Sequence, residues 1–326
     1  MNALRLLAGL AVVLSPLTLS SQEAQEADDA PEARVLYTIK PDGTERQLLY
    51  ELEDVDTISS PAVSSDGRLA FSAWNQAEGD TRANSQVFIL TLSTLRALKT
   101  LGDGAMPSWS PRARRISYTR FSPNKGVWVM KSDGQSKVLL DRRGTDALWS
   151  PNGHRIAYVK TSRGARTIAV YDMVEDRYIE LWEDSGSPYG VITGGFAWSP
   201  DSRRLCIRGR RLKDNDQDLE DDSEIAIVTV EKAPKTKVYD SLQDGSFPSI
   251  AWNSDGSRVV FSKSLGKDKP TQLFSFDPTS EDDPALFPGQ DPQRNNASPC
   301  WDLDGSVLIY ASAPFEAKDE DTDTSD

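Results

Sequence analysis

The chain has 326 residues, of which 38% are hydrophobic, and its 37 Lys and Arg against 50 Asp and Glu give it a net charge of −13. This length fits one large domain or two small ones, and the negative charge argues against a nucleic-acid partner, which requires a basic surface. Three stretches, at residues 22–32, 214–224 and 316–326, together carry a net charge of −17, so the rest of the chain is close to neutral. We expect these stretches to be solvated.

The first 21 residues have the layout of a secretory signal peptide. MNALR carries one positive charge, LLAGLAVVL at 6–14 is an apolar run, and SPLTLSSQ offers small residues for cleavage. The run is shorter than the roughly 20 apolar residues of a membrane span, although an uncleaved anchor remains an alternative. We expect a mature protein that begins near Ser21 or Gln22, has no membrane span and is periplasmic or secreted, with an acidic linker at 22–33.

A hairpin pattern, RVLYTIKPDGTERQLLY, occupies residues 34–50, and a different phrase then recurs six times. The copies align on a tryptophan, which a valine replaces in the first copy: PAVSSDGRLAF (61–71), PSWSPRARRISY (107–118), ALWSPNGHRIAY (147–158), FAWSPDSRRLCI (196–207), IAWNSDGSRVVF (250–261) and PCWDLDGSVLIY (299–310). Their anchor residues, 40 to 54 residues apart, are Val63, Trp109, Trp149, Trp198, Trp252 and Trp301. A period of this size is typical of propeller blades.

Each copy predicts a β-hairpin. An apolar strand ends at the anchor, Ser-Pro-Asp-Gly or a variant of it reverses the chain, and a second apolar strand follows. Ala113 and Ser202 stand where the other four copies have the glycine that accepts a left-handed conformation, which costs another residue about 1 kcal/mol. The repetition also makes Ser199 a turn residue rather than a nucleophile.

A second hairpin follows each of the first five copies, at 86–101, 126–140, 167–182, 224–240 and 272–288. The sixth copy lacks such a follower, whereas hairpin 34–50 lacks a leader. The pattern therefore predicts an all-β, six-bladed β-propeller of four-stranded antiparallel blades over 34–314, closed by N- and C-terminal strands. In this arrangement 34–50 supplies the outer strands of the blade that contains 299–310, which removes exposed sheet edges. Residues 315–326 are expected to be a disordered acidic tail.

The phrase WSPDG-x-x-I-A-Y, followed by a strand such as GVWVMKSDG, resembles the WD-like repeat of the TolB-type six-bladed propeller. The resemblance covers residues 34–312. It implies the propeller fold, and it leaves the function open, because periplasmic interaction proteins and accessory domains of peptidases use the same repeat. TolB itself has an α/β domain before its propeller, whereas about a dozen residues separate the expected signal peptide from the first strand here.

The anchor tryptophans and the two cysteines are predicted to serve packing. A small residue precedes most of the anchors, namely Ala62, Ser108, Ala197, Ala251 or Cys300, so we expect the tryptophans to be wedges between blades rather than a ligand platform. Cys206 and Cys300 are assigned to blades two steps apart, beyond the ~7 Å Cα separation of a disulfide. Both are therefore predicted to be buried free thiols.

The single histidine restricts enzymatic options. His154 falls in a hairpin turn, where it serves neither a Ser-His-Asp triad nor a histidine-rich metal site. Chemistry that uses two carboxylates remains open, and Asp146 and Asp184 lie close enough to predicted inner strands to approach the channel mouth. The acidic loop 214–224 lacks the glycine and glutamate of a calcium loop, so we expect a solvated loop there, with calcium binding as the alternative. We expect no bound metal elsewhere and no cofactor.

Connections on one face of the predicted ring differ in length: 74–85, 183–195 and 209–223 are long, whereas 121–125 is short. Unequal loops on a rigid scaffold are common binding sites, and Trp74 and Tyr189 are aromatic residues of these loops. The sequence thus favours a monomeric, non-enzymatic propeller that binds an envelope protein or peptide through Trp74, Tyr189, Asp184 and Asp146. The alternatives are a carboxylate-based glycan-acting enzyme or sugar-binding propeller, and a structural scaffold within a larger envelope complex.

Overall fold

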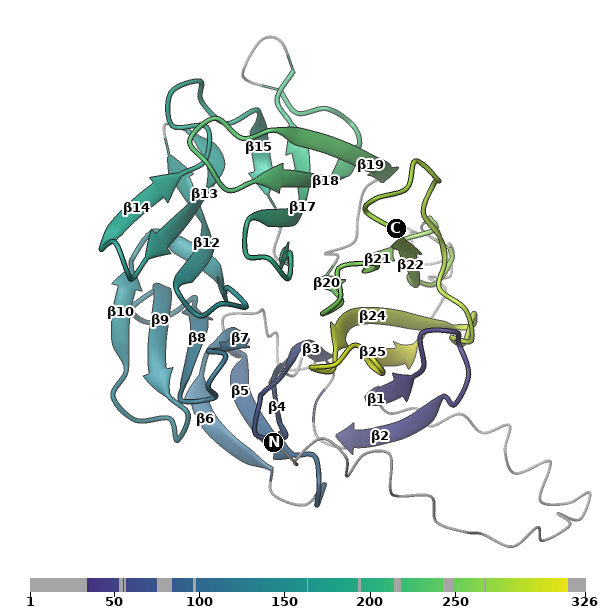
Figure 1. Cartoon of the computed structure of the whole chain (residues 1–326). Coiled ribbons are helices and arrows are strands. Elements are labelled where there is room, and N and C mark those ends of the chain that lie inside the picture. Colours follow the sequence, from purple (N-terminus) through teal and green to yellow (C-terminus); the bar gives the residue numbers. More distant parts are fainter. Residues whose placement is uncertain are drawn as a thin grey trace, which may run out of the picture.

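The structure is a computed structural model that describes residues 34–52, 55, 57–74, 84–95, 98–162, 164–192, 195–213, 218–242, 249–266 and 268–315. The chain forms six antiparallel sheets arranged as the blades of a ring (Figure 1). The predicted all-β, six-bladed propeller is therefore confirmed. Within these ranges no helix is long and apolar enough to cross a membrane. The expected signal peptide, the acidic linker and residues 316–326 lie outside the described residues.

The first three blades each contain four consecutive strands. Blade 1 consists of β3 (Thr57–Val63), β4 (Arg68–Trp74), β5 (Gln86–Thr91) and β6 (Lys99–Asp103). Blade 2 consists of β7 (Ala105–Trp109), β8 (Arg115–Arg120), β9 (Gly126–Lys131) and β10 (Val138–Asp141). Blade 3 consists of β11 (Gly144–Trp149), β12 (Arg155–Ser162), β13 (Ala165–Asp172) and β14 (Arg177–Glu180). In each blade the first strand is innermost and the fourth is outermost.

In blade 4 the inner strand is divided into β15 (Tyr189–Ile192) and β16 (Ala197–Trp198), which both pair with β17 (Arg204–Arg211); β18 (Ser223–Thr229) and β19 (Thr236–Leu242) complete the blade. Blade 5 consists of β20 (Ile250–Trp252), β21 (Val259–Lys263), β22 (Gln272–Phe276) and β23 (Ala285–Leu286).

Blade 6 joins the two ends of the described chain. Its inner strands, β24 (Arg294–Trp301) and β25 (Leu308–Pro314), pair with β1 (Arg34–Ile39) and β2 (Gln47–Leu52) in the order β2-β1-β25-β24. The register of β1 on β25 runs from Val35 opposite Ser312 to Ile39 opposite Leu308. The predicted closure of the ring by hairpin 34–50 is confirmed.

The hairpin turns between the first and second strands follow the residue pattern of the repeat. Ala113 and Ser202 have φ angles of 52° and 58°, and the glycines at the same position of the other copies also have positive φ angles. A hydroxyl, carboxamide or carboxylate at the start of the turn secures it: Ser199 Oγ, for example, accepts a hydrogen bond from the backbone N–H of Arg204 at 2.9 Å. Ser199 therefore has the structural role that the sequence predicted.

Most of the apolar core lies between blades, in six clusters, one for each pair of neighbours. Trp109, Trp198, Trp252 and Trp301 are buried, as expected of wedges, whereas Trp149 is only partly buried. The indole N–H of Trp198 donates to the carbonyl of Leu148 in the preceding blade at 3.2 Å. The anchors thus join neighbouring blades by packing and by hydrogen bonds.

Four inner strands contain a β-bulge at one shared position, three residues before the anchor. The residues there have positive φ angles of 54° to 59° and are Ser60, Met106, Asp146 and Ser298. The pairing with the second strand skips two residues at each of these places. Because the same conformation recurs with four different side chains, it belongs to the scaffold and is not specific to Asp146.

The two cysteines are free thiols, as predicted; Cys206 is fully buried, whereas Cys300 is partly buried, so its predicted burial is only partly confirmed. Burial raises the pKa of Cys206 above its usual range and that of Cys300 to about 12.

Both thiols are therefore expected to be protonated at pH 8 and to react slowly with Ellman's reagent in the native protein. Unfolding the unreduced protein should release two reactive thiols per chain, and Cys300→Ser should leave one. A native protein with no titratable thiol after unfolding would contradict the assignment.

Candidate binding face

The second strands of the blades all end on one face of the ring, which we call the connection face. Trp74 is the last residue of β4, Arg120 of β8, Arg211 of β17 and Lys263 of β21. The long connections predicted from the sequence begin here. The connection face is therefore where variable side chains are presented by rigid strands.

A set of four ion pairs, which we call the rim pairs, lies on the connection face. A basic residue near the end of a second strand meets a carboxylate: Arg120 with Asp103 at 3.8 Å, Lys160 with Glu180 at 2.6 Å, Arg211 with Glu224 at 2.9 Å, and Lys263 with Asp240 at 2.8 Å. The first and the last of these pairs connect neighbouring blades. Each rim carboxylate is thus oriented by a cation.

Three of the four rim cations also lie over an aromatic ring. The distances from cation to ring centroid are 5.5 Å for Arg120 over Trp128, 5.2 Å for Arg211 over Tyr189 and 5.3 Å for Lys263 over Phe274. Such contacts add about 0.5–2 kcal/mol each, depending on how far the cation is desolvated. The rim is therefore held in place before any ligand arrives.

Tyr189 does not lie in a loop, and this prediction was wrong. It begins β15, is fully buried, and contacts Trp182 edge to face at 5.5 Å between ring centroids. Gly209 provides the space for its ring, since a Cβ there would come within 2.3 Å of Tyr189 Cδ1. A buried ring cannot anchor a partner, so Tyr189 is a core residue.

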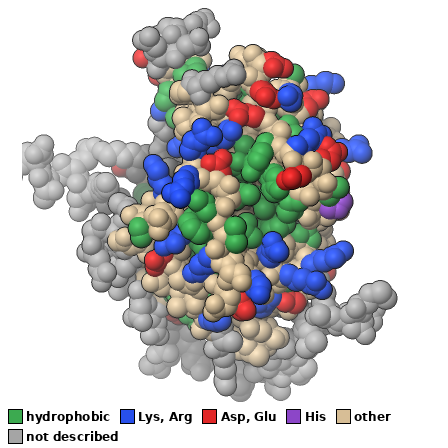
Figure 2. Space-filling model, turned by 90° about the vertical axis from the view of Figure 1, so that its left-hand side faces the viewer, with side chains coloured by type: hydrophobic (Ala, Val, Ile, Leu, Met, Phe, Trp, Pro, Cys, Tyr) green, Lys and Arg blue, Asp and Glu red, His purple; other side chains and the backbone are tan. Residues whose placement is uncertain are grey.

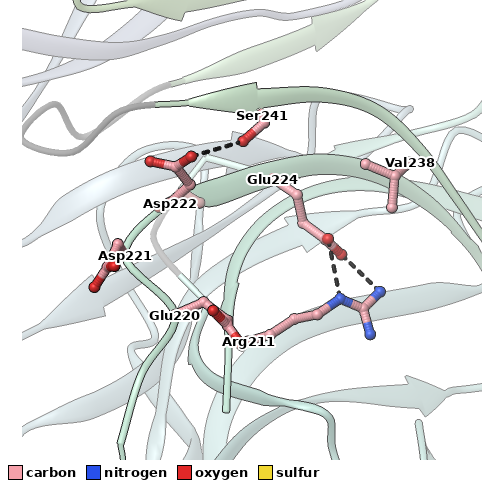
Figure 3. Close-up of a pocket in the computed structure, with 8 residues that line it drawn as sticks. Arg211, Glu220, Asp221, Asp222, Glu224, Val238 and Ser241 are labelled. Carbon is pink, nitrogen blue, oxygen red and sulfur yellow. Dashed lines mark hydrogen bonds and ion pairs between the residues drawn. The ribbon is translucent and has the colours of Figure 1, made fainter. Parts of the chain in front are cut away.

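The hydroxyl of Tyr189 donates to Glu224, which also receives two hydrogen bonds from Arg211. Burial, together with the hydrogen bond to Glu224, raises the pKa of Tyr189, and the same carboxylate raises the pKa of Arg211. Figure 3 shows the carboxylate of Glu224 directed at the guanidinium of Arg211. The three side chains form a fixed charged unit at the rim of blade 4.

A pocket of about 350 Å³ opens beside this unit and is lined by Arg211, Glu220, Asp221, Asp222, Ser223, Glu224, Val238 and Ser241. In Figure 3, Asp222 interacts with Ser241, the two oxygens being 3.3 Å apart, while Asp221 is directed away from the Arg211 side chain. No group of three His, Cys, Asp or Glu side chains in the described ranges is arranged to hold a metal. Asp214 and Asp216 of the acidic loop fall outside those ranges.

Trp74 lies on the connection face, as predicted, but it is a strand residue and not the loop residue that the sequence suggested. It ends β4 opposite Thr57 of the inner strand, and its side chain is partly exposed. It therefore remains a candidate contact residue, whereas the residues that follow it, 75–83, lie outside the described part of the chain.

Asp146 and Asp184 do not form a carboxylate pair. Asp146 lies in β11, the innermost strand of blade 3, whereas Asp184 is exposed in the turn after β14, the outermost strand of the same blade. Asp184 follows Glu183, which pairs with Lys232 in the turn between β18 and β19, the two outer strands of blade 4, so it lies on the outer side of the ring and not beside the innermost strand. Glycosidase carboxyl groups are about 5–9.5 Å apart, so this pair does not suit that chemistry.

The rim pairs were missed in the sequence, although a signal for them exists. Each of the four second strands places a Lys or Arg at or near its end, after a largely apolar stretch, as in ISYTR, IAYVK, CIRGRR and VVFSK. The acidic partners are 13 to 23 residues away along the chain. They become neighbours only through the stacking of strands and blades.

Solved structures with similar folds include a TolB from Agrobacterium tumefaciens, with a TM-score of 0.63 and 15% identity over 87% of this chain and 99% of that one. TolB from Acinetobacter baumannii has a TM-score of 0.57 and 14% identity, over 86% of this chain and 64% of that one. A gluconolactonase from Xanthomonas campestris has a TM-score of 0.56 and 14% identity, over 84% of this chain and 92% of that one. No family model and no curated protein matches the sequence. The chain has a TolB-like propeller fold, and at this identity the likeness concerns the fold alone.

Proposed function

We propose that this protein is an exported, non-enzymatic propeller that binds a protein or peptide of the cell envelope on its connection face. The observation that supports this proposal is a partly exposed tryptophan, Trp74, at a rim whose charges are already paired. Tryptophan is enriched among residues that contribute most to protein interfaces. A pre-organised rim also lowers the entropic cost of binding.

An enzyme acting on a sugar or lactone is the alternative, and the gluconolactonase among the structurally similar proteins is its support. Asp146 would then be the candidate catalytic carboxylate. Its carboxylate accepts a hydrogen bond from Thr145 at 2.8 Å, and its backbone N–H donates to Thr119 at 2.8 Å. The bulge that holds Asp146 recurs in three other blades without a carboxylate, which favours the binding proposal.

Substituting Trp74 with Ala should weaken binding of a partner captured from the native envelope fraction by about tenfold or more, as expected for an aromatic anchor. Biolayer interferometry with the purified partner would measure this change. Leu303→Ala is the control, because Leu303 is also exposed but lies in a hairpin turn on the opposite face.

Equal loss of affinity in the two variants, or no loss in either, would place the interface elsewhere. Hydrolysis of a lactone or polysaccharide by the purified protein, abolished by Asp146→Asn, would instead establish the enzymatic alternative.

A further inference from the structure

A tyrosine hydroxyl and an arginine Nε–H lie buried between blades 1 and 2 without a hydrogen-bond acceptor among the described residues. They belong to Tyr118, which is 1% exposed, and to Arg120, which ends the same strand, β8. Burial raises the pKa of Tyr118 to about 12, and the charge of Arg120 opposes this rise, so the two side chains are close enough to interact. A buried donor that lacks an acceptor is costly, and two neighbouring ones call for an explanation.

The corresponding tyrosine of blade 3 has the acceptor that Tyr118 lacks. Tyr158, like Tyr118, follows its anchor tryptophan by nine residues, and its hydroxyl donates to Asp141 of blade 2 at 3.0 Å. In blade 4, Glu224 accepts hydrogen bonds from the hydroxyl of Tyr189 and from a neighbouring guanidinium. In both places the buried tyrosine donates to a carboxylate. A carboxylate is therefore the group that suits the two donors in blade 2.

Asp103, the carboxylate on the blade 1 side of this interface, does not take that position. Its side chain is 58% exposed, and its oxygen lies 3.8 Å from the guanidinium of Arg120. The other three rim pairs have distances of 2.6 to 2.9 Å. Because an exposed, loosely formed ion pair contributes little to stability, another carboxylate can replace Asp103 beside Arg120.

Trp74 and Arg120 border the same interface from its two sides. Alternation along β4 puts Trp74 on the side of Ser72, whose Oγ accepts a hydrogen bond from the backbone N–H of Met106 in blade 2 at 3.4 Å. The side chain of Arg120 is directed toward blade 1, where it meets Asp103, and its guanidinium lies over the ring of Trp128. A ligand held by Trp74 is thus presented to this interface.

Blade 2 has an excess of basic side chains. Residues 105–141 contain seven Lys and Arg against two Asp and Glu, whereas the full chain has a net charge of −13. Lys137 of this blade also lies at the interface with blade 1, where its Nζ donates to the carbonyl of Leu101 at 2.9 Å. Figure 2, which faces the side of the ring with β10 and β14, shows Lys and Arg side chains across this side. Such an excess attracts a negatively charged ligand and speeds its encounter with the protein.

We propose that Tyr118 and Arg120 form a carboxylate-binding site at the rim between blades 1 and 2, which takes an acidic side chain or the C-terminal carboxylate of a peptide partner. The incoming carboxylate displaces Asp103 and accepts hydrogen bonds from the Nε–H of Arg120 and the hydroxyl of Tyr118, while an adjoining apolar group contacts Trp74. A change of rotamer of the Arg120 side chain, which is 18% exposed, brings both donors to the ligand.

Hydrogen bonds to an ionised carboxylate are stronger than those between neutral groups. This inference rests on the function proposed for the connection face, and it specifies the chemical group that is recognised there.

Nuclear magnetic resonance of the nitrogen-15-labelled full protein tests the proposal by following the Nε–H signal of Arg120, which is assigned by its loss in Arg120→Lys. The probes are N-acetyltryptophan, which has a C-terminal carboxylate, the dipeptide amide N-acetyl-Trp-Glu-NH2, which has a side-chain carboxylate, and N-acetyltryptophanamide, which has none. At constant ionic strength we expect a saturable shift with a carboxylate probe and no shift with the amide. The carboxylate probe that binds more tightly identifies the source of the carboxylate.

Tyr118→Phe and Arg120→Lys should each lower the affinity for the carboxylate probe by about tenfold, as expected for the loss of a hydrogen bond to a charged group. Lysine keeps the positive charge but lacks the Nε–H, so this variant separates directed hydrogen bonding from charge alone. Asp103→Asn should raise the affinity by about threefold, because it removes the competing exposed ion pair. The indole N–H signal of Trp128, beside Arg120, reports binding in these variants.

Tyr310→Phe is the matched control. Tyr310 also follows its anchor by nine residues, is fully buried, and has a hydroxyl without an acceptor in the described part of the chain, but it lies in blade 6. This variant should bind the carboxylate probe with unchanged affinity, and thermal melts should show that all variants are folded. An equal shift with all three probes, no shift with either carboxylate probe, or equal loss of affinity in Tyr310→Phe and Tyr118→Phe would overturn the carboxylate site.

Trp74→Ala separates this inference from the proposed function. Binding that Trp74→Ala weakens but that does not require a carboxylate would remove the inference and leave the function proposed for the connection face. Carboxylate-dependent binding that Trp74→Ala leaves unchanged would support the site at Tyr118 and Arg120 and remove Trp74 from the interface.

Discussion

Deletion of residues 34–52 is expected to abolish cooperative folding. These residues form β1 and β2, and they place Val35, Leu36, Ile39 and Leu52 in the buried core. Loss of a large buried aliphatic side chain costs about 2–5 kcal/mol, so losing these together approaches the whole stability of an ordinary domain, about 5–15 kcal/mol. The deletion also leaves β25 as an open, partly apolar edge, which promotes association. Circular dichroism melts and light scattering would measure both effects.

Deletion of residues 316–326 is the control for this experiment. The segment is predominantly acidic, so we expect the melting temperature to remain within about 2 °C of that of the intact chain, an effect below about 1 kcal/mol. A chain without 34–52 that melts cooperatively as a monomer would show that the ring does not depend on its closing blade.

Substitution of Trp198 with Ala is expected to destabilise the protein by about 3–5 kcal/mol, the range for truncating a buried aromatic residue. Trp198 belongs to the cluster between blades 3 and 4, is 6% exposed, and its indole N–H donates to the carbonyl of Leu148. The substitution removes both the packing and that hydrogen bond. Equilibrium unfolding in guanidinium chloride would measure the change.

Trp128→Ala is the matched control, because the side chain of Trp128 is only partly buried and its indole N–H donates to a nearby loop carbonyl, that of Asn124. It should cost clearly less than Trp198→Ala. If the two variants were equally destabilised, wedging between blades would not be the main role of the anchor tryptophans.

The fold could be predicted because the residues that specify each hairpin are close together in the sequence, and because the same pattern recurs six times. Each hairpin turn carries its own chemistry, so that even the two departures from glycine, Ala113 and Ser202, adopt the expected left-handed conformation. The closure of the ring followed from an unmatched hairpin at each end. Packing between blades then required a large anchor and a small neighbour in most copies; Val63 in the first copy and Leu148 in the third are the exceptions.

The candidate site was harder to predict from the sequence, because its paired side chains come from different strands and blades that only the folded ring brings together. Tyr189 lies in SPYGVITGG, whose glycines suggest a loop, yet β17 extends to Arg211 and pairs with it as a strand. The pairing of Arg120 with Asp103 requires the position of one blade relative to the next. A net charge averaged over the chain likewise conceals that residues 105–180, which make up blades 2 and 3, hold fourteen Lys and Arg against seven Asp and Glu.

The pairing of β1 with β25, which we call the seam of blade 6, determines how the ring responds to a pulling force. Strands β1 and β25 are antiparallel, and Val35 lies opposite Ser312 at the end where both strands lead to the termini. A force applied between the two ends of the chain therefore separates the hydrogen bonds of this seam one after another instead of shearing them all at once. A partner that pulled on both ends would therefore open the ring between β1 and β25, breaking the pairing from Val35 toward Ile39. The other blades would remain joined to one another by the chain itself.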